Sequence, residues 1–201
     1  MRFTKDITEN DMILAFLRGE IDSPRFGPTY HHFLKEKGLK SDLISNANIQ
    51  DKQENKLRRA LLDDVRGINR KFWLFEGLPV NIKWQKYGLS LGDFKKIKYA
   101  NFPTWKKLSG GTLLVINGAK NTDSIPTDEN ANQNIRVVAK NLKTGKTYPE
   151  IILVTKNPDS ELILFEGHTR ATAYLYDQTT FPEELEVIIG FSENLDQWVW
   201  Y

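Results

Sequence analysis

The segment from residue 162 to residue 174 constrains the fold of this chain more than any other, because an apolar strand leads through one glycine directly into a helix. Residues 162–165 predict the strand, Gly167 the turn, and the residues from His168 onward the helix. The first N–H groups of a helix lack backbone acceptors, and the positive end of its dipole attracts phosphate or carboxylate. The segment therefore predicts a strand–turn–helix unit with an anion site at the start of the helix.

Three side chains in the first turn of this predicted helix suit an anion site. Arg170 offers a permanently charged planar fork, Thr169 a hydroxyl, and His168 an imidazole that ordinarily titrates near neutral pH. A second interpretation stays open at this point. In it, Gly167 is a plain turn, His168 and Thr169 are ordinary cap residues, and Arg170 is a solvated surface charge.

Residues 166–173, Glu-Gly-His-Thr-Arg-Ala-Thr-Ala, resemble the G-x-x-R-x-x-A signature of the ParB/sulfiredoxin-like superfamily. That superfamily includes the N-terminal domain of partition proteins, sulfiredoxin and the ADP-dependent free-serine kinases. The flanking segments follow a similar order over about residues 111 to 191. The segments that resemble family elements are 112–116 (first strand), 134–142 (helix), 148–154 (strand), 161–165 (strand) and 185–190 (closing strand).

The resemblance implies a nucleotide, such as ATP, ADP or CTP, bound with Mg²⁺ at this helix. Gly167, His168 and Thr169 would approach the phosphates, and Arg170 would neutralise their charge. Glu166 would contact the metal ion or the substrate. In the kinase branch a catalytic glutamate follows the first strand, so a proton carrier is sought there as well as at His168. The acids available in that region are Asp123, our candidate, and Asp128 and Glu129.

Departures from the family pattern reduce the number of family activities that this chain could have. Sulfiredoxin needs the cysteine of a G-C-H-R motif, but His168 stands at that position, so reduction of sulfinic acid is excluded. Partition proteins carry G-E-R-R, with two adjacent arginines, where this chain has Gly-His-Thr-Arg. Against the Gly-His-His-Arg of the kinases, Thr169 replaces the second histidine. Mg²⁺-dependent phosphoryl transfer, nucleotide hydrolysis and nuclease activity stay open as reactions, and so does the question of whether the protein is an enzyme.

A second glycine-rich turn, Gly110-Gly111, precedes the segment that resembles the first strand. Such a pair can bring backbone N–H groups close to an anionic ligand. It lacks the GxxxxGK[ST] spacing of a phosphate-binding loop, and a flexible turn is the alternative. We keep Gly110 and Gly111 as candidate ligand contacts.

Composition and charge limit the remaining classes of protein. The 201 residues are 40% hydrophobic and contain no cysteine, which excludes disulfides, thiolate catalysis and cysteine-ligated zinc. No stretch approaches the ~20 apolar residues of a membrane span, and no signal-type segment opens the chain, so we expect a cytoplasmic protein.

Residues 1–109 contain 21 Lys and Arg against 13 Asp and Glu, whereas residues 110–201 contain 7 against 13. This asymmetry indicates either a basic surface for nucleic acid or two halves that attract each other.

The chain is expected to form an α+β fold, in which a mainly helical region (1–109) packs on a ParB/sulfiredoxin-like domain (110–201) with a small mixed sheet. Helices are predicted after the Thr8 and Ser90 capping signals and over residues 52–66, and a long polar loop over residues 117–133. The aromatic C-terminal residues Trp198, Trp200 and Tyr201 indicate burial against the N-terminal helices or, alternatively, base stacking.

The expected function is binding of a nucleotide or another phosphorylated ligand at the Gly167 turn. The alternative is a non-catalytic ParB-like protein of a mobile element that binds DNA or a protein partner through its basic N-terminal half.

Overall fold

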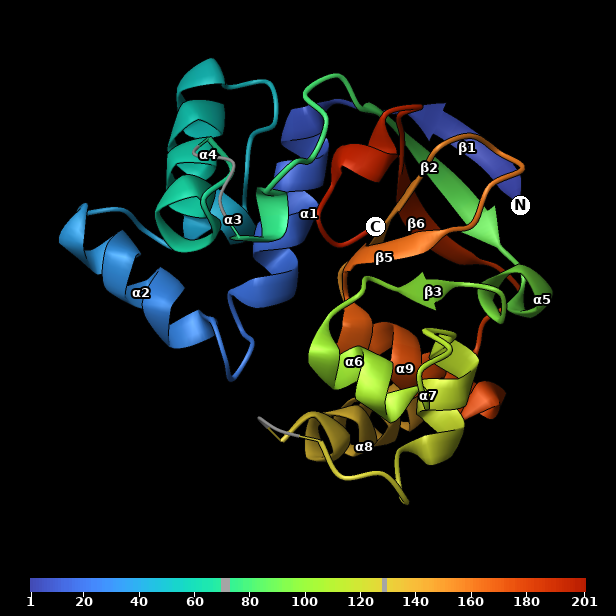
Figure 1. Ribbon diagram of the computed structural model, residues 1–201. Coiled ribbons are helices and arrows are strands. Elements are labelled where there is room, and N and C mark those ends of the chain that lie inside the picture. Colours follow the sequence, from blue (N-terminus) through green and yellow to red (C-terminus); the bar gives the residue numbers. More distant parts are fainter. Residues whose placement is uncertain (70–72, 128–129) are drawn as a thin grey trace.

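The computed structural model describes residues 1–69, 73–127 and 130–201 and contains a six-stranded mixed sheet with helices on both faces (Figure 1). The predicted α+β class is confirmed. The strand order is β1-β2-β6-β4-β5-β3, with parallel pairing of β4 with β6 and of β3 with β5. The strands are β1 (Arg2–Asp6), β2 (Lys83–Leu89), β3 (Lys98–Tyr99), β4 (Ile151–Thr155), β5 (Ile163–Glu166) and β6 (Leu185–Phe191).

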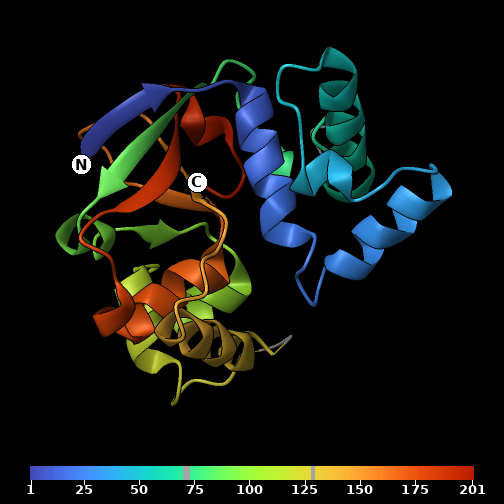
Figure 2. The same ribbon diagram turned by 180° about the vertical axis from the view of Figure 1, so that it is seen from behind.

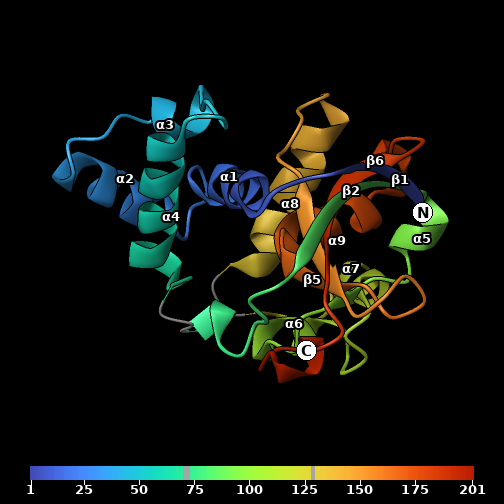
Figure 3. The same ribbon diagram turned by 90° about the horizontal axis from the view of Figure 1, so that it is seen from above.

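Two groups of helices flank the sheet, and they stay separate when the molecule is viewed from behind (Figure 2). The first group comprises α1 (Glu9–Glu20), α2 (Gly27–Glu36), α3 (Asp42–Ser45) and α4 (Lys52–Arg66). The second comprises α6 (Pro103–Leu108), α7 (Val115–Asn121), α8 (Ala131–Lys143) and α9 (His168–Tyr176). Seen from above, α2, α3 and α4 lie beyond α1, which separates them from the sheet (Figure 3). The short elements are α5 (Leu91–Phe94) and the 3₁₀ turns η1 (Trp73–Phe75), η2 (Gln178–Thr180) and η3 (Leu195–Gln197).

Alternate side chains of a strand point to opposite faces of the sheet, and helices cover both faces, so the central strands are buried on both sides. On β4, Ile152 and Val154 join the core that contains α1, whereas Ile151 and Leu153 join the core that contains α9. On β5, Phe165 meets Phe16 of α1, with ring centroids 5.9 Å apart. This double-sided burial explains the continuous apolar runs of β4 and β6.

Strands from both sides of residue 110 share this sheet, because β1, β2 and β3 precede that residue and β4, β5 and β6 follow it. The predicted boundary between residues 109 and 110 therefore does not divide the sheet from the rest of the chain. Ion pairs also cross it, between Arg2 and Glu184 and between Lys86 and both Glu150 and Glu186. These contacts support the interpretation in which a basic half attracts an acidic half.

Local capping signals in the sequence place several helices. Thr8 and Asp11 form a reciprocal capping box at α1, and Ser90 and Asp93 form another at α5. The helix predicted over residues 52–66 is confirmed as α4, whose N-cap is the Asp51 side chain. Within the described residues no helix is long and apolar enough to cross a membrane.

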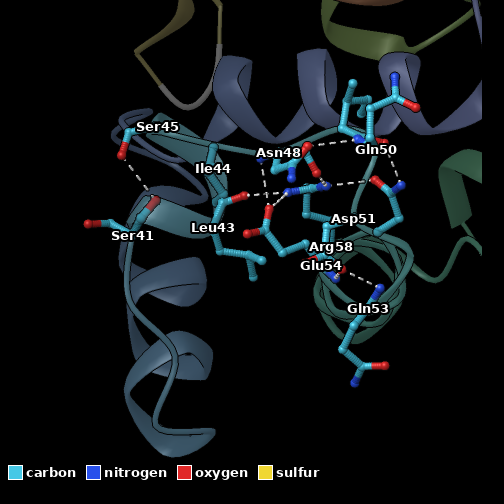
Figure 4. A network of polar contacts seen from close by, with 12 residues as sticks. Ser41, Leu43, Ile44, Ser45, Asn48, Gln50, Asp51, Gln53, Glu54 and Arg58 are labelled. Atoms are coloured by element: carbon cyan, nitrogen blue, oxygen red, sulfur yellow. Dashed lines mark hydrogen bonds and ion pairs between the residues drawn. The ribbon is translucent and has the colours of Figure 1, made fainter.

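The buried guanidinium of Arg58 holds the connection between α3 and α4 in place (Figure 4). One terminal nitrogen donates to the Leu43 carbonyl at 2.9 Å and to the Glu54 carboxylate at 2.8 Å. The other donates to the carbonyl of Asn48 at 3.0 Å and to the side chain of Asn55 at 2.6 Å. Both terminal nitrogens of Arg58 thus have acceptors, and in the described part of the chain its Nε alone is buried without one.

Two predictions about the segment after Gly111 are wrong. Residues 112–116 do not form a strand, because α7 begins at Val115 and Leu114 makes only an isolated bridge to Lys98. A short apolar run does not distinguish a strand from a buried helix, and here Val115 and Ala119 face the core one helical turn apart. The polar loop predicted over residues 117–133 is too long at both ends, because α7 extends to Asn121 and α8 begins at Ala131.

Candidate functional site

The turn between β5 and α9 has the backbone geometry that the sequence predicts. Gly167 takes a left-handed conformation, with φ of 99°, and no side chain caps the helix that follows. Within the described part of the chain, the N–H groups of His168, Thr169 and Arg170 find no acceptor, and the first turn contains no acid. The start of α9 therefore presents free donors and the positive end of a helix dipole.

Arg170 does not face solvent at this turn, so the interpretation as a solvated surface charge is wrong. Its side chain is 8% exposed and forms an ion pair with Glu166, the last residue of β5. One terminal nitrogen donates to the Gly19 carbonyl at 3.1 Å, and the other donates to the Glu150 carbonyl at 3.4 Å and to Glu166. Among the residues that the structure describes, Nε of the guanidinium finds no partner. Arg170 thus links the end of α1, the entry to β4 and the end of β5, and we name this arrangement the Arg170 latch.

Gly19 permits the close approach of α1 to the latch. A Cβ atom at this position would lie 2.8 Å and 2.9 Å from the two terminal nitrogens of Arg170, and 3.2 Å from the Glu166 carboxylate. Such distances are shorter than normal contacts, so any larger residue displaces α1 or the guanidinium. The role that the resemblance gives Arg170, neutralisation of phosphate, is untested by these contacts, which use three of its five N–H donors and leave Nε–H and one Nη1–H.

His168 lies in an aromatic cage formed by Tyr99 of β3 and by Phe102 and Trp105, which follow that strand. The ring centroids of Tyr99, Trp105 and Phe102 lie 6.0, 5.3 and 5.4 Å from the imidazole. The residue keeps some exposed surface, but Nε2 is sealed from solvent and has no hydrogen-bond partner in residues 1–69, 73–127 and 130–201. Burial, together with the charges of Arg66 and Arg170, lowers the pKa of His168 to about 3. The expectation that this imidazole titrates near neutral pH is therefore wrong, and it is a weak base.

This lowered pKa predicts an acid-sensitive contribution to stability. The unfolded chain binds a proton at His168 below about pH 6.5, but the folded chain binds it only near pH 3, so stability falls as the pH drops through this window. Between pH 6.5 and 5 the free energy of unfolding should lose about 2 kcal/mol from this residue. Urea unfolding at both pH values measures this loss, which should be absent in His168→Phe and present in the wild type.

The exposed His32 supplies the control for this prediction. His32→Phe should keep the acid sensitivity of the wild type, which makes the comparison independent of other titrating groups. Equal acid sensitivity in His168→Phe and the wild type would show that the imidazole is not held neutral.

Arg66, at the end of α4, is the side chain that sequence reasoning missed. The residue is 7% exposed, and its guanidinium carbon lies 4.1 Å from the ring centroid of Phe26 and 4.9 Å from that of Trp73. Nε and Nη1 are buried without a hydrogen-bond acceptor in the described part of the chain, and the nearest carboxylate oxygen, on Glu20, is 3.6 Å from Nε. Arg66 is therefore far less satisfied than Arg58 on the same helix.

A sequence signal for Arg66 was present. Arg58 and Arg66 lie four residues before and after the buried Leu62, and therefore on the same face of α4. Two arginines on an apolar face require buried acceptors or a ligand.

The other predicted site residues do not meet at the start of α9. Asp123 pairs with Arg136 at 2.8 Å and accepts a hydrogen bond from Tyr176, the last residue of α9, so it lies at the opposite end of that helix. The N–H groups of Gly110 and Gly111 donate to the carbonyls of Lys107 and Lys106 at 3.0 and 2.8 Å, and thereby close the end of α6 instead of cradling an anion. Asp128 and Glu129 lie outside the described residues.

The residues at the turn do not fit the Mg²⁺ site that the resemblance implies. Glu166 is 13% exposed and already paired with Arg170, and no second acid accompanies it in the first turn of α9. Among the residues that the structure describes, no group of three or more His, Asp or Glu side chains is placed to hold a metal ion. We therefore assign no chemical step to a metal ion here.

Comparison with known proteins adds no relative: no family model, no curated protein and no solved structure matches this chain. The resemblance to the ParB/sulfiredoxin-like superfamily therefore stays a prediction.

Proposed function

We propose that this protein binds a nucleotide, with the phosphate groups held between the start of α9 and Arg66. The observation that carries the proposal is the buried guanidinium of Arg66, whose Nε and Nη1 have no acceptor in the described part of the chain. Leaving a buried donor unsatisfied costs about 1–3 kcal/mol, and more for a charged group. An anionic ligand supplies the missing acceptors.

The free N–H groups of α9 support the same location for the phosphates. Arg66 lies close enough to His168 for its charge to lower the pKa of the imidazole. Arg66 on α4 and the first turn of α9 therefore both act electrostatically on the region around His168. Together they supply a charged donor and the N–H groups of His168 and Thr169 to a phosphate group.

Aromatic side chains beside this region support a ligand that carries a planar base. Trp73, which packs on Arg66, is 44% exposed. Trp200 donates from its indole nitrogen to the Trp73 carbonyl at 3.0 Å and packs on Phe102, with ring centroids 4.5 Å apart. Phe102 in turn contacts His168. Partly exposed aromatic rings next to a phosphate site are suited to stacking with a base.

The proposal concerns binding and leaves catalysis aside. His168 is a weak base, and Glu166 is committed to Arg170. A general acid or base needs a free group whose pKa lies near the working pH.

A thermal-shift screen tests this function. ATP, ADP, CTP, pyrophosphate and a short DNA duplex are each added to the protein, and the screen is repeated on Arg66→Met, which keeps an apolar stem. A nucleotide at 100 times its dissociation constant should stabilise the wild type by about 2.7 kcal/mol. The same nucleotide should leave Arg66→Met unshifted. The control is Arg136→Met, which removes an exposed arginine of α8 that pairs with Asp123 near the C-terminal end of α9, and the shift should persist.

Two other results contradict the proposal. Nucleotides that stabilise Arg66→Met as much as the wild type place the site elsewhere. Stabilisation by DNA alone, falling steeply as salt rises, favours the DNA-binding alternative, because each phosphate contact releases counterions.

A further inference from the structure

Glu20 occupies the position at Arg66 that an anionic ligand needs. It is the last residue of α1 and is 4% exposed. One carboxylate oxygen accepts a hydrogen bond from the Tyr30 hydroxyl at 2.8 Å, and the other lies 3.6 Å from Nε of Arg66. The carboxylate is thus held by α2 while it faces α4. A buried acid in this position is the nearest anion to a cation that otherwise lacks acceptors.

Charged groups from three other elements and one hydroxyl from a fourth act on this carboxylate. Burial raises the pKa of Glu20 to about 7, and Glu166 on β5 raises it too. Arg66 on α4, the Tyr30 hydroxyl on α2 and Arg170 on α9 oppose that rise. The ion pair with Arg66 therefore forms fully only above neutral pH. Below it, the neutral carboxyl competes weakly for the guanidinium.

We propose that Glu20 is an internal competitor for Arg66: its carboxylate pairs with the guanidinium in the free protein, and the phosphate of a ligand displaces it. The inference rests on the proposed nucleotide site. Once Arg66 contacts phosphate, Glu20 loses its partner and takes up a proton, so ligand affinity falls as the pH rises above 7. Glu20 is then a residue that sets the pH range of binding without itself binding the ligand.

The test is calorimetric titration of ATP at pH 7.5 and 8.5, where phosphate groups with a second pKa near 6 have already lost their protons. Because Glu20 binds a single proton with a pKa of about 7, we expect Glu20→Gln to bind ATP more tightly than the wild type. The predicted gain is roughly fourfold at pH 7.5 and roughly thirtyfold at pH 8.5. Titrations in two buffers of different ionisation enthalpy should show uptake of about one proton by the wild type and none by Glu20→Gln.

Two further variants make this test specific. Glu36→Gln, at an exposed acid of α2 that pairs with His32, should bind ATP as the wild type does at both pH values. Tyr30→Phe removes the hydroxyl that stabilises the charged form of Glu20, so its loss of affinity should begin at a higher pH. Melting curves of each variant show that it is folded before titration.

The outcomes separate this inference from the proposed function. If ATP binds, requires Arg66, and binds Glu20→Gln no more tightly than the wild type at pH 8.5, the competitor role is wrong and the nucleotide site stands. If ATP binds neither the wild type nor Glu20→Gln, the nucleotide site is wrong, and the inference fails with it.

Discussion

Replacing Arg170 with alanine should lower the free energy of unfolding by about 3–5 kcal/mol, because it leaves the buried Glu166 carboxylate without its partner. The carbonyls of Gly19 and Glu150 would lose a donor as well, and with it the contact that joins α1 to the entry of β4. Urea unfolding at pH 7.5 measures the change. A chain of this size should melt roughly 10 °C lower.

The exposed ion pair between Arg136 and Asp123 is the matched control. Its side chains are 47% and 61% exposed, so Arg136→Ala should leave the unfolding curve nearly unchanged. The double variant Arg170→Met with Glu166→Leu should recover much of the lost stability, since apolar side chains of similar volume often replace a buried ion pair without loss. Unchanged stability of Arg170→Ala, combined with lost ATP binding, would instead favour the phosphate-binding role that the family resemblance implies.

Truncating Trp198 should have an effect of similar size. This side chain is 2% exposed, its indole nitrogen donates to the Leu74 carbonyl at 2.7 Å, and its ring centroid lies 5.5 Å from that of Phe165 on β5. Trp198→Ala should therefore cost about 3–5 kcal/mol, measured by thermal or urea unfolding. The predicted burial is confirmed for Trp198, although Leu74 and Phe165 lie in η1 and β5 and not in the N-terminal helices, and Tyr201 is 36% exposed.

The neighbouring Val199 is 48% exposed and provides the comparison. Val199→Ala should change the free energy of unfolding by no more than about 0.5 kcal/mol. An unchanged melting temperature of Trp198→Ala, together with a loss of ATP binding, would show that this ring serves base stacking instead.

Sequence patterns predicted the elements whose signals are local. The helix over residues 52–66 has an aspartate cap and an apolar face, and the strand–glycine–helix junction at Gly167 has the expected backbone. β1 gave no such signal, because all five of its residues are exposed and it lacks an apolar face. An edge strand of this kind is defined by its pairing with β2, which the sequence of β1 alone does not encode.

Functional assignments at the junction depended on contacts that local sequence does not contain. Arg170 sits in a motif that suggests phosphate binding, yet its guanidinium reaches the Gly19 carbonyl, 151 residues away in the chain. His168 looked like a titrating imidazole, but the cage formed by Tyr99, Phe102 and Trp105 keeps it neutral. The motif predicts where Arg170 and His168 lie in the chain, but tertiary contacts determine the hydrogen bonds of the arginine and the pKa of the histidine.

Phosphate binding at the start of α9 beside Arg66 is the central proposal for this protein, and NMR titration with ATP tests it most directly. The backbone amide signals of His168 and Thr169 and the side-chain Nε–H signal of Arg66 should shift together, with one dissociation constant. Saturable shifts confined to other residues, with these three signals unmoved, would contradict the account.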